Sequence, residues 1–130
     1  MLRPMLLMAA LLPLLTACLK DYEPVVEGIW DEVNVVSING PIEREWHFIT
    51  NELKIYRYHE DTPDNLILEH SGRYIVRNTA IGLYLRIAEM NYSTYNDDWE
   101  ILKLKNGLMI ISLEVPGGVI YKELEKRGDN

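Results

Sequence analysis

Turn-forming residues recur at short, regular intervals along most of this chain, and their spacing constrains the fold more than any other feature. Groups rich in Asn, Gly, Pro and Asp interrupt apolar stretches at positions 39–41, 50–51, 61–65, 78–79, 96–97, 106–107 and 116–118. Most are separated by about 8–12 residues, which is typical of a β-sandwich or β-barrel. Seven turns of this kind predict eight strands.

The composition after Cys18 favours the same secondary structure. This region holds 21 Val and Ile residues and all eight tyrosines, but only two alanines. β-branched and aromatic residues are enriched in strands, and strong helix formers are scarce here. We therefore expect an all-β domain.

The turns and apolar stretches together give the expected strands, at 29–37, 43–49, 52–59, 66–76, 83–87, 99–104, 108–114 and 119–124. Links this short join antiparallel neighbours, because a parallel pair needs a long crossover. An antiparallel meander of eight strands follows. It leaves two exposed edges unless the first strand pairs with the last, so we expect a closed or nearly closed barrel.

Period-two alternation assigns faces to several strands. Trp46 and Phe48 should point inward, with Glu45 and His47 on the opposite face. In the first strand Trp30 and Val33 fall on opposite faces by strict alternation. We therefore infer a β-bulge near 31–32 that would let both side chains face the core.

The aromatic residues divide into two candidate functional sets. The expected interior set could line a ligand cup or form a solid core, and it comprises Trp30, Trp46, Phe48, Tyr74 and Trp99. The expected outward set is a candidate partner surface and comprises Tyr56, Tyr58, Tyr84 and Tyr95. The polar stretch 88–98 is too long for a hairpin turn and should form a loop at the barrel rim.

The N-terminus carries targeting information. Of its first 17 residues 13 are hydrophobic, Arg3 is the one charged residue, and Cys18 follows Leu15-Thr16-Ala17. This layout indicates a secretory signal at 1–17, and its apolar run is short for a spanning helix. The sequence Leu15-Thr16-Ala17-Cys18 resembles the lipobox of bacterial lipoproteins. That resemblance implies cleavage before Cys18, diacylglycerol on its thiol and an acyl chain such as palmitate on its amine.

The segments after the leader would then be a lipid anchor and tether at 18–26, a folded domain at 27–126 and a C-terminal tail at 127–130. Leu19 at the position after the anchor favours the outer membrane, on its periplasmic side or at the cell surface. Removal of the leader leaves 12 basic and 20 acidic residues. This balance disfavours nucleic-acid binding, so the expected partner is the membrane, reached through acylated Cys18.

No pattern predicts catalysis, a metal or a cofactor. His47, His59 and His70 do not have the spacing of a known metal site. The lipobox resemblance implies that Cys18 carries lipid and is not a nucleophile, and no serine lies in a nucleophile-elbow motif. Paired acids such as Asp97-Asp98 could in principle flank a glycosidic bond, which leaves a hydrolase as a distant alternative.

Gly28-Ile29-Trp30, which opens the first expected strand, resembles the G-x-W signature of lipocalins. The stretches 46–48, 72–76, 99–104 and 108–111 extend the similarity, so the domain resembles the small lipocalin-like domains of bacterial lipoproteins. The family implies an eight-stranded barrel, a small hydrophobic ligand and a C-terminal arginine on the signature tryptophan, for which the nearest counterpart is Arg127.

The sequence thus predicts a lipid-anchored, non-catalytic barrel that binds a small apolar ligand or an envelope protein. The alternative is an accessory or structural subunit of a surface complex that acts through its outer tyrosines.

Overall fold

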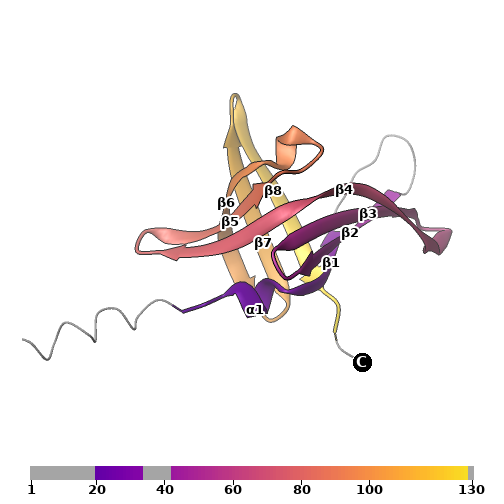
Figure 1. Cartoon of the computed structure of the whole chain (residues 1–130), viewed down its shortest axis with the longest axis horizontal. Helices are drawn as coiled ribbons and strands as arrows, with labels where there is room; N and C mark the ends of the chain where they lie inside the picture. Colours follow the sequence, from indigo (N-terminus) through magenta and orange to yellow (C-terminus); the bar gives the residue numbers. More distant parts are fainter. Residues whose placement is uncertain (1–19, 34–41, 129–130) are drawn as a thin grey trace, which may run out of the picture.

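The computed structural model describes residues 20–33 and 42–128, and this part of the chain forms a closed eight-stranded barrel (Figure 1). The strands are β1 (Gly28–Val33), β2 (Ile42–Ile49), β3 (Glu52–His59), β4 (Thr62–Thr79), β5 (Gly82–Ala88), β6 (Asp97–Lys105), β7 (Leu108–Val115) and β8 (Gly118–Lys126). A short helix, α1 (Glu23–Val26), precedes β1, and a 3₁₀ turn, η2 (Ser93–Tyr95), lies between β5 and β6.

Four predictions fall wholly or partly outside the described residues: the signal peptide, the anchor at Cys18, the end of the first expected strand at 34–37 and the turn at 39–41. Neither helix in the described ranges has the length and apolar character of a membrane-spanning segment.

The predicted antiparallel meander is confirmed, and so is its closure. Each strand pairs with the next one in sequence, and β8 returns to pair with β1, with Trp30 opposite Lys126 and Val33 opposite Glu123. Every strand of the described part therefore has two neighbours. This arrangement removes the exposed edges that an open meander would leave.

The predicted turns explain where several strands end. β3 has the bounds expected from the sequence, and it follows Thr50 and Asn51, whose φ angles are 40° and 65°. Asn106 and Gly107 have φ angles of 53° and 73° between β6 and β7. Two successive residues with positive φ are the signature of the type I′ hairpin turn, which asparagine and glycine adopt at low cost.

β4 is longer than predicted. The expected turn at 61–65 is restricted to its first residues, because β4 begins at Thr62, which pairs with His59. Two register shifts, between Ile55 and Tyr56 and between Arg57 and His59, accommodate the additional residues. The β3–β4 hairpin consequently reaches well beyond its neighbours (Figure 1).

The bulge predicted near 31–32 is absent. β1 pairs with both β2 and β8 without a register shift, so its side chains alternate strictly. Trp30 and Glu32 face the interior and are 0% and 7% exposed, whereas Val33 is half-buried on the other face. The apolar character of Val33 suggested the wrong geometry, since the inward position is taken by an acid with partners inside the barrel.

Helix α1 closes one end of the barrel. Val26 is fully buried, and its carbonyl accepts a hydrogen bond of 2.7 Å from Trp30 Nε1. Lys126 Nζ lies 5.6 Å from the centroid of the Trp30 ring and donates a 3.1 Å hydrogen bond to the Val25 carbonyl. The packed domain therefore begins before residue 27. The cation on the tryptophan of the G-x-W motif is Lys126, not Arg127.

Candidate functional site

The five aromatic side chains predicted to face inward all lie in the barrel core. Trp30, Trp46 and Phe48 are 0% exposed, and Tyr74 and Trp99 are 1% exposed. The Phe48 ring centroid lies 6.1 Å from that of Trp46 and 4.9 Å from that of Tyr74. Ring contacts of this kind fill space, so this half of the interior has the character of a solid core rather than a cup.

Tyr74 carries a cost of this packing. Its hydroxyl is one of two buried side-chain polar atoms in the described ranges that have no hydrogen-bond partner. Burial raises the pKa of the Tyr74 phenol to about 12. The group therefore stays neutral over the physiological range.

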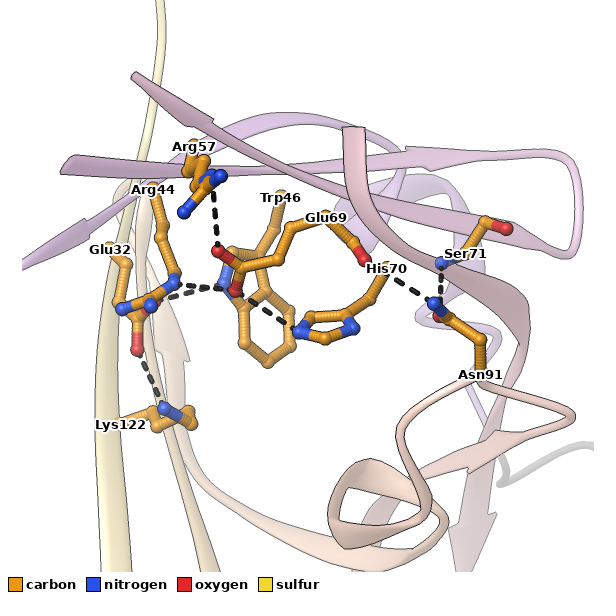
Figure 2. Close-up of polar contacts among 9 residues, drawn as sticks. All are labelled: Glu32, Arg44, Trp46, Arg57, Glu69, His70, Ser71, Asn91 and Lys122. Atoms are coloured by element: carbon orange, nitrogen blue, oxygen red, sulfur yellow. Dashed lines mark hydrogen bonds and ion pairs between the residues drawn. The ribbon is translucent and has the colours of Figure 1, made fainter. Parts of the chain in front are cut away.

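The inner face becomes polar along the strands away from α1. Glu32 lies two residues beyond Trp30, and its carboxylate binds two groups from other strands (Figure 2). Lys122 Nζ is 2.7 Å from Oε1, and Trp46 Nε1 donates a 3.3 Å hydrogen bond to Oε2. The Glu32 and Lys122 side chains are 6% and 21% exposed, so this ion pair is largely removed from water.

A second carboxylate, that of Glu69, gathers three cationic or ionisable groups at the same end. Arg44 Nε lies 3.0 Å from Oε1, His70 Nε2 lies 3.0 Å from the same oxygen, and Arg57 Nε lies 3.9 Å from Oε2 (Figure 2). Glu69 occupies the extra position of the β3–β4 register shift, since Ile55 pairs with His70 and Tyr56 with Leu68. The bulge is therefore what turns this carboxylate toward Arg44.

The rim loop covers this polar end. Asn91 bridges the loop to β4, accepting a 3.1 Å hydrogen bond from Ser71 N and donating a 3.3 Å bond to the Glu69 carbonyl. The Tyr92 ring stacks on His70 with centroids 5.2 Å apart. Tyr95 in η2 packs edge-on against Trp46, with centroids 5.6 Å apart.

The polar end is satisfied by its own pairs except at one atom. His70 Nδ1 is buried and has no hydrogen-bond partner among the described residues. In the described ranges, no three His, Cys, Asp or Glu side chains converge closely enough to hold a metal ion. The charges at this end hold β1, β2, β4 and β8 together and leave little unpaired chemistry for a ligand.

The sequence prediction missed this polar half of the interior. The signal was present in the alternation: Glu32 is two residues from Trp30, Arg44 two from Trp46, and Lys122 two from Leu124. Each charged residue thus shares a face with an apolar anchor. Only the pairing of strands distant in sequence supplies the partners that offset the desolvation cost of burying these charges.

Three of the four tyrosines predicted to point outward are half-buried on the outer face, namely Tyr56, Tyr58 and Tyr84. The prediction for Tyr95 is wrong, because this residue is only 9% exposed. η2 folds its ring over the barrel mouth, and its carbonyl accepts a 3.0 Å hydrogen bond from Trp99 Nε1. Burial, followed by the nearby charge of Glu32, raises the pKa of Tyr95 to about 12.

Glu45 lies on the outer face, as predicted, but it is only 3% exposed. It forms an ion pair with Arg127 and lies 2.9 Å from His47 Nε2, and Arg127 also binds Asp31 at 2.8 Å. These contacts, first of all the hydrogen bond to Asp31, raise the pKa of Arg127. Arg127, expected to begin a tail, thus fastens the outer surface over β1 and β2.

The outer face of β5 to β8 carries a hollow, here called the outer groove, of about 490 Å³. Its lining comprises Tyr84, Asp97, Asp98, Glu100, Leu102, Ser112, Leu113, Glu114, Val119 and Tyr121. Tyr121 is 65% exposed and was not among the predicted surface residues. The predicted Tyr84 and the unexpected Tyr121 therefore belong to one site.

Comparisons of this chain with models of protein families, with curated proteins and with solved structures find no match.

Proposed function

We propose that this chain is a lipid-anchored, non-catalytic β-barrel lipoprotein of the bacterial outer membrane that binds an envelope partner through its outer face. The lipid anchor would be acylated Cys18, as the lipobox-like sequence at 15–18 suggests. Several acyl chains hold a protein on a bilayer almost permanently, whereas one chain does so only marginally.

The filled interior is the observation that carries this proposal. A carrier of apolar molecules needs an apolar cavity open at one end. Here the apolar half is occupied by five fully buried aromatic rings, and the other half is occupied by charged pairs under the rim loop. The binding capacity is therefore expected on the outside, where the tyrosines and the outer groove lie.

The anchor can be tested on the full chain expressed in a Gram-negative bacterium. Mass spectrometry should find a protein that lacks residues 1–17 and carries diacylglycerol and an acyl group on Cys18. The Cys18→Ser variant should lose both groups and leave the outer-membrane fraction. An unmodified thiol at Cys18 in the wild-type protein would contradict the anchor.

The mode of binding can be tested with a neutral apolar probe, N-phenylnaphthylamine, added to the purified full chain. We expect no saturable quenching of tryptophan emission, because Trp46 and Trp99 are buried in the aromatic core. Saturable quenching that disappears in Trp46→Ala would replace the partner-binding proposal with ligand carriage.

Photo-crosslinking in intact cells tests the partner surface. A benzoylphenylalanine at position 84 or 121 should give one recurrent protein adduct, and the same group at position 56 serves as the comparison on a distant strand. Adducts from position 56 alone would keep the function and move the surface. No adduct from any position would refute partner binding through the tyrosines.

A further inference from the structure

We infer that the outer groove is a docking site for a basic peptide segment of the partner protein, with a Lys or Arg side chain held between Tyr84 and Tyr121. This inference deepens the proposed function and rests on it for the existence of a partner. It adds the place and the chemistry of recognition.

The strand register builds the groove as a straight row across four strands. Tyr84 pairs with Glu100, Glu100 with Ser112, and Ser112 with Tyr121. Paired strands lie about 4.8 Å apart, so the two tyrosines stand roughly 14 Å apart across the sheet. An extended chain rises about 3.3 Å per residue, so this span accommodates about four residues of peptide.

The charge of the groove is of one sign. Its lining includes four carboxylates and no basic residue. Asp98 is held by Arg86, with Nε–Oδ1 at 2.7 Å, but Glu100 and Glu114 have no ion-pair partner among the described residues. Glu100 lies in the row between the two tyrosines and Glu114 lies beside it, opposite Val119. These two unpaired carboxylates complement a cationic side chain, which aromatic ring faces also attract.

Ser112 places a hydroxyl at the centre of the groove. The residue is 8% exposed and lines the groove, and its hydroxyl forms no hydrogen bond with the described residues. This hydroxyl is not one of the two buried atoms without a partner, so it opens to the groove. An ammonium or guanidinium group at the centre of the row would donate a hydrogen bond to it.

Other occupants fit the observations less well. The described residues hold no converging set of three metal-binding side chains, which argues against a metal ion in this groove. Strand addition requires a free sheet edge, whereas the row that forms this groove crosses the face of the paired strands β5 to β8. A saccharide would stack on tyrosine but would not need the unpaired carboxylates. Side-chain recognition of a basic segment uses all of these features.

The test uses the full chain, labelled with nitrogen-15 and purified in detergent, and three probes followed by nuclear magnetic resonance. The first probe is the blocked peptide Gly-Ser-Arg-Ser-Gly, the second has Gln in place of Arg, and the third is the disaccharide chitobiose. We expect the Arg peptide to shift the backbone signals of residues 84, 100, 112 and 121, and the other two to shift none of them.

Variants of the groove then separate recognition from general charge attraction. Glu100→Gln and Tyr121→Ala should each raise the Kd of the Arg peptide about two- to fivefold, which is the range for a partly exposed ion pair or cation–π contact. Glu125→Gln on the outer face of β8 and Tyr92→Ala in the rim loop are the matched controls and should leave Kd unchanged.

Several outcomes would overturn the inference. Equal shifts with the Gln peptide would show that charge is not recognised, and shifts with chitobiose alone would assign the groove to sugars. Equal weakening by Glu125→Gln would reduce binding to net charge. Failure of the peptide test together with crosslinks from position 56 would leave the partner-binding function intact and remove only this groove.

Discussion

The ion pair between Glu32 and Lys122 joins the first strand to the last, and removing one partner should destabilise the fold because the other charge stays buried. The carboxylate is 6% exposed and lies 2.7 Å from Lys122 Nζ. Removing one member of a buried pair typically costs about 3–5 kcal/mol, because the other charge stays buried without compensation. Replacing both members should cost less than the two single losses added together.

The structure places the two single losses at or just below the lower end of that range. Lys122→Met leaves Glu32 with only the Trp46 Nε1 hydrogen bond, so we expect a loss of about 3 kcal/mol. Glu32→Gln keeps an oxygen for Trp46 Nε1, and Lys122 is 21% exposed, so about 2 kcal/mol is expected. The double variant should lose about 2 kcal/mol, which gives a coupling energy of about 3 kcal/mol.

Urea unfolding of the full chain, followed by tryptophan emission, measures each free energy of unfolding. Lys105→Met and Glu125→Gln change the same residue types at exposed positions and should each stay within about 0.5 kcal/mol of the wild type. A double variant that loses the sum of the two single losses would refute the argument, because the two charges would then act independently.

Three further predictions concern other parts of the barrel. The pKa of Tyr95 is raised to about 12 from an ordinary value of 10.0, so the folded state holds this proton more tightly than the unfolded state does. The contribution of Tyr95 to the free energy of unfolding should therefore be complete below pH 10 and be lost as the pH rises through 12. Tyr95→Phe should reduce this loss of stability in urea titrations at alkaline pH. Gly72→Ala should destabilise by about 1–3 kcal/mol because its Cβ would lie 2.7 Å from the Ala88 carbonyl oxygen and 2.8 Å from Met90 N, whereas Gly118→Ala, with open space around it, should leave the melting temperature unchanged. Lys126→Met should release α1, so the Trp30 indole proton should exchange faster with deuterium. The amide protons of β3 should keep their exchange rates. Equal acceleration in β3 would instead indicate a global loss of stability of about 1 kcal/mol.

The architecture was predictable because its determinants are local. Asn106–Gly107 and Thr50–Asn51 adopt the positive φ angles that short hairpins need, and β3 between two such signals has its predicted bounds. Closure followed from the number of strands and the cost of open edges. The interior position of Trp46 and Phe48 followed from alternation alone.

The charged interior was not predictable in the same way. The acid at position 32 reads as a surface residue until β8 is known to bring Lys122 beside it, ninety residues later in the chain. Tyr95 was misplaced for a similar reason, because η2 has no sequence period that shows which way its ring turns. The groove likewise depends on register, since Tyr84 and Tyr121 face the same hollow only after three strand pairings are fixed.

The pairing of β1 with β8 has a consequence for how the molecule comes into being. When the chain leaves the ribosome or a translocation channel N-terminus first, the edge of β1 that faces β8 stays unpaired until Gly118–Lys126 has emerged. Pairings that distant form slowly, so completion is delayed to the very end of synthesis or export. A stop codon anywhere before β8 would then yield an aggregation-prone open sheet with two unpaired edges, not a smaller closed barrel.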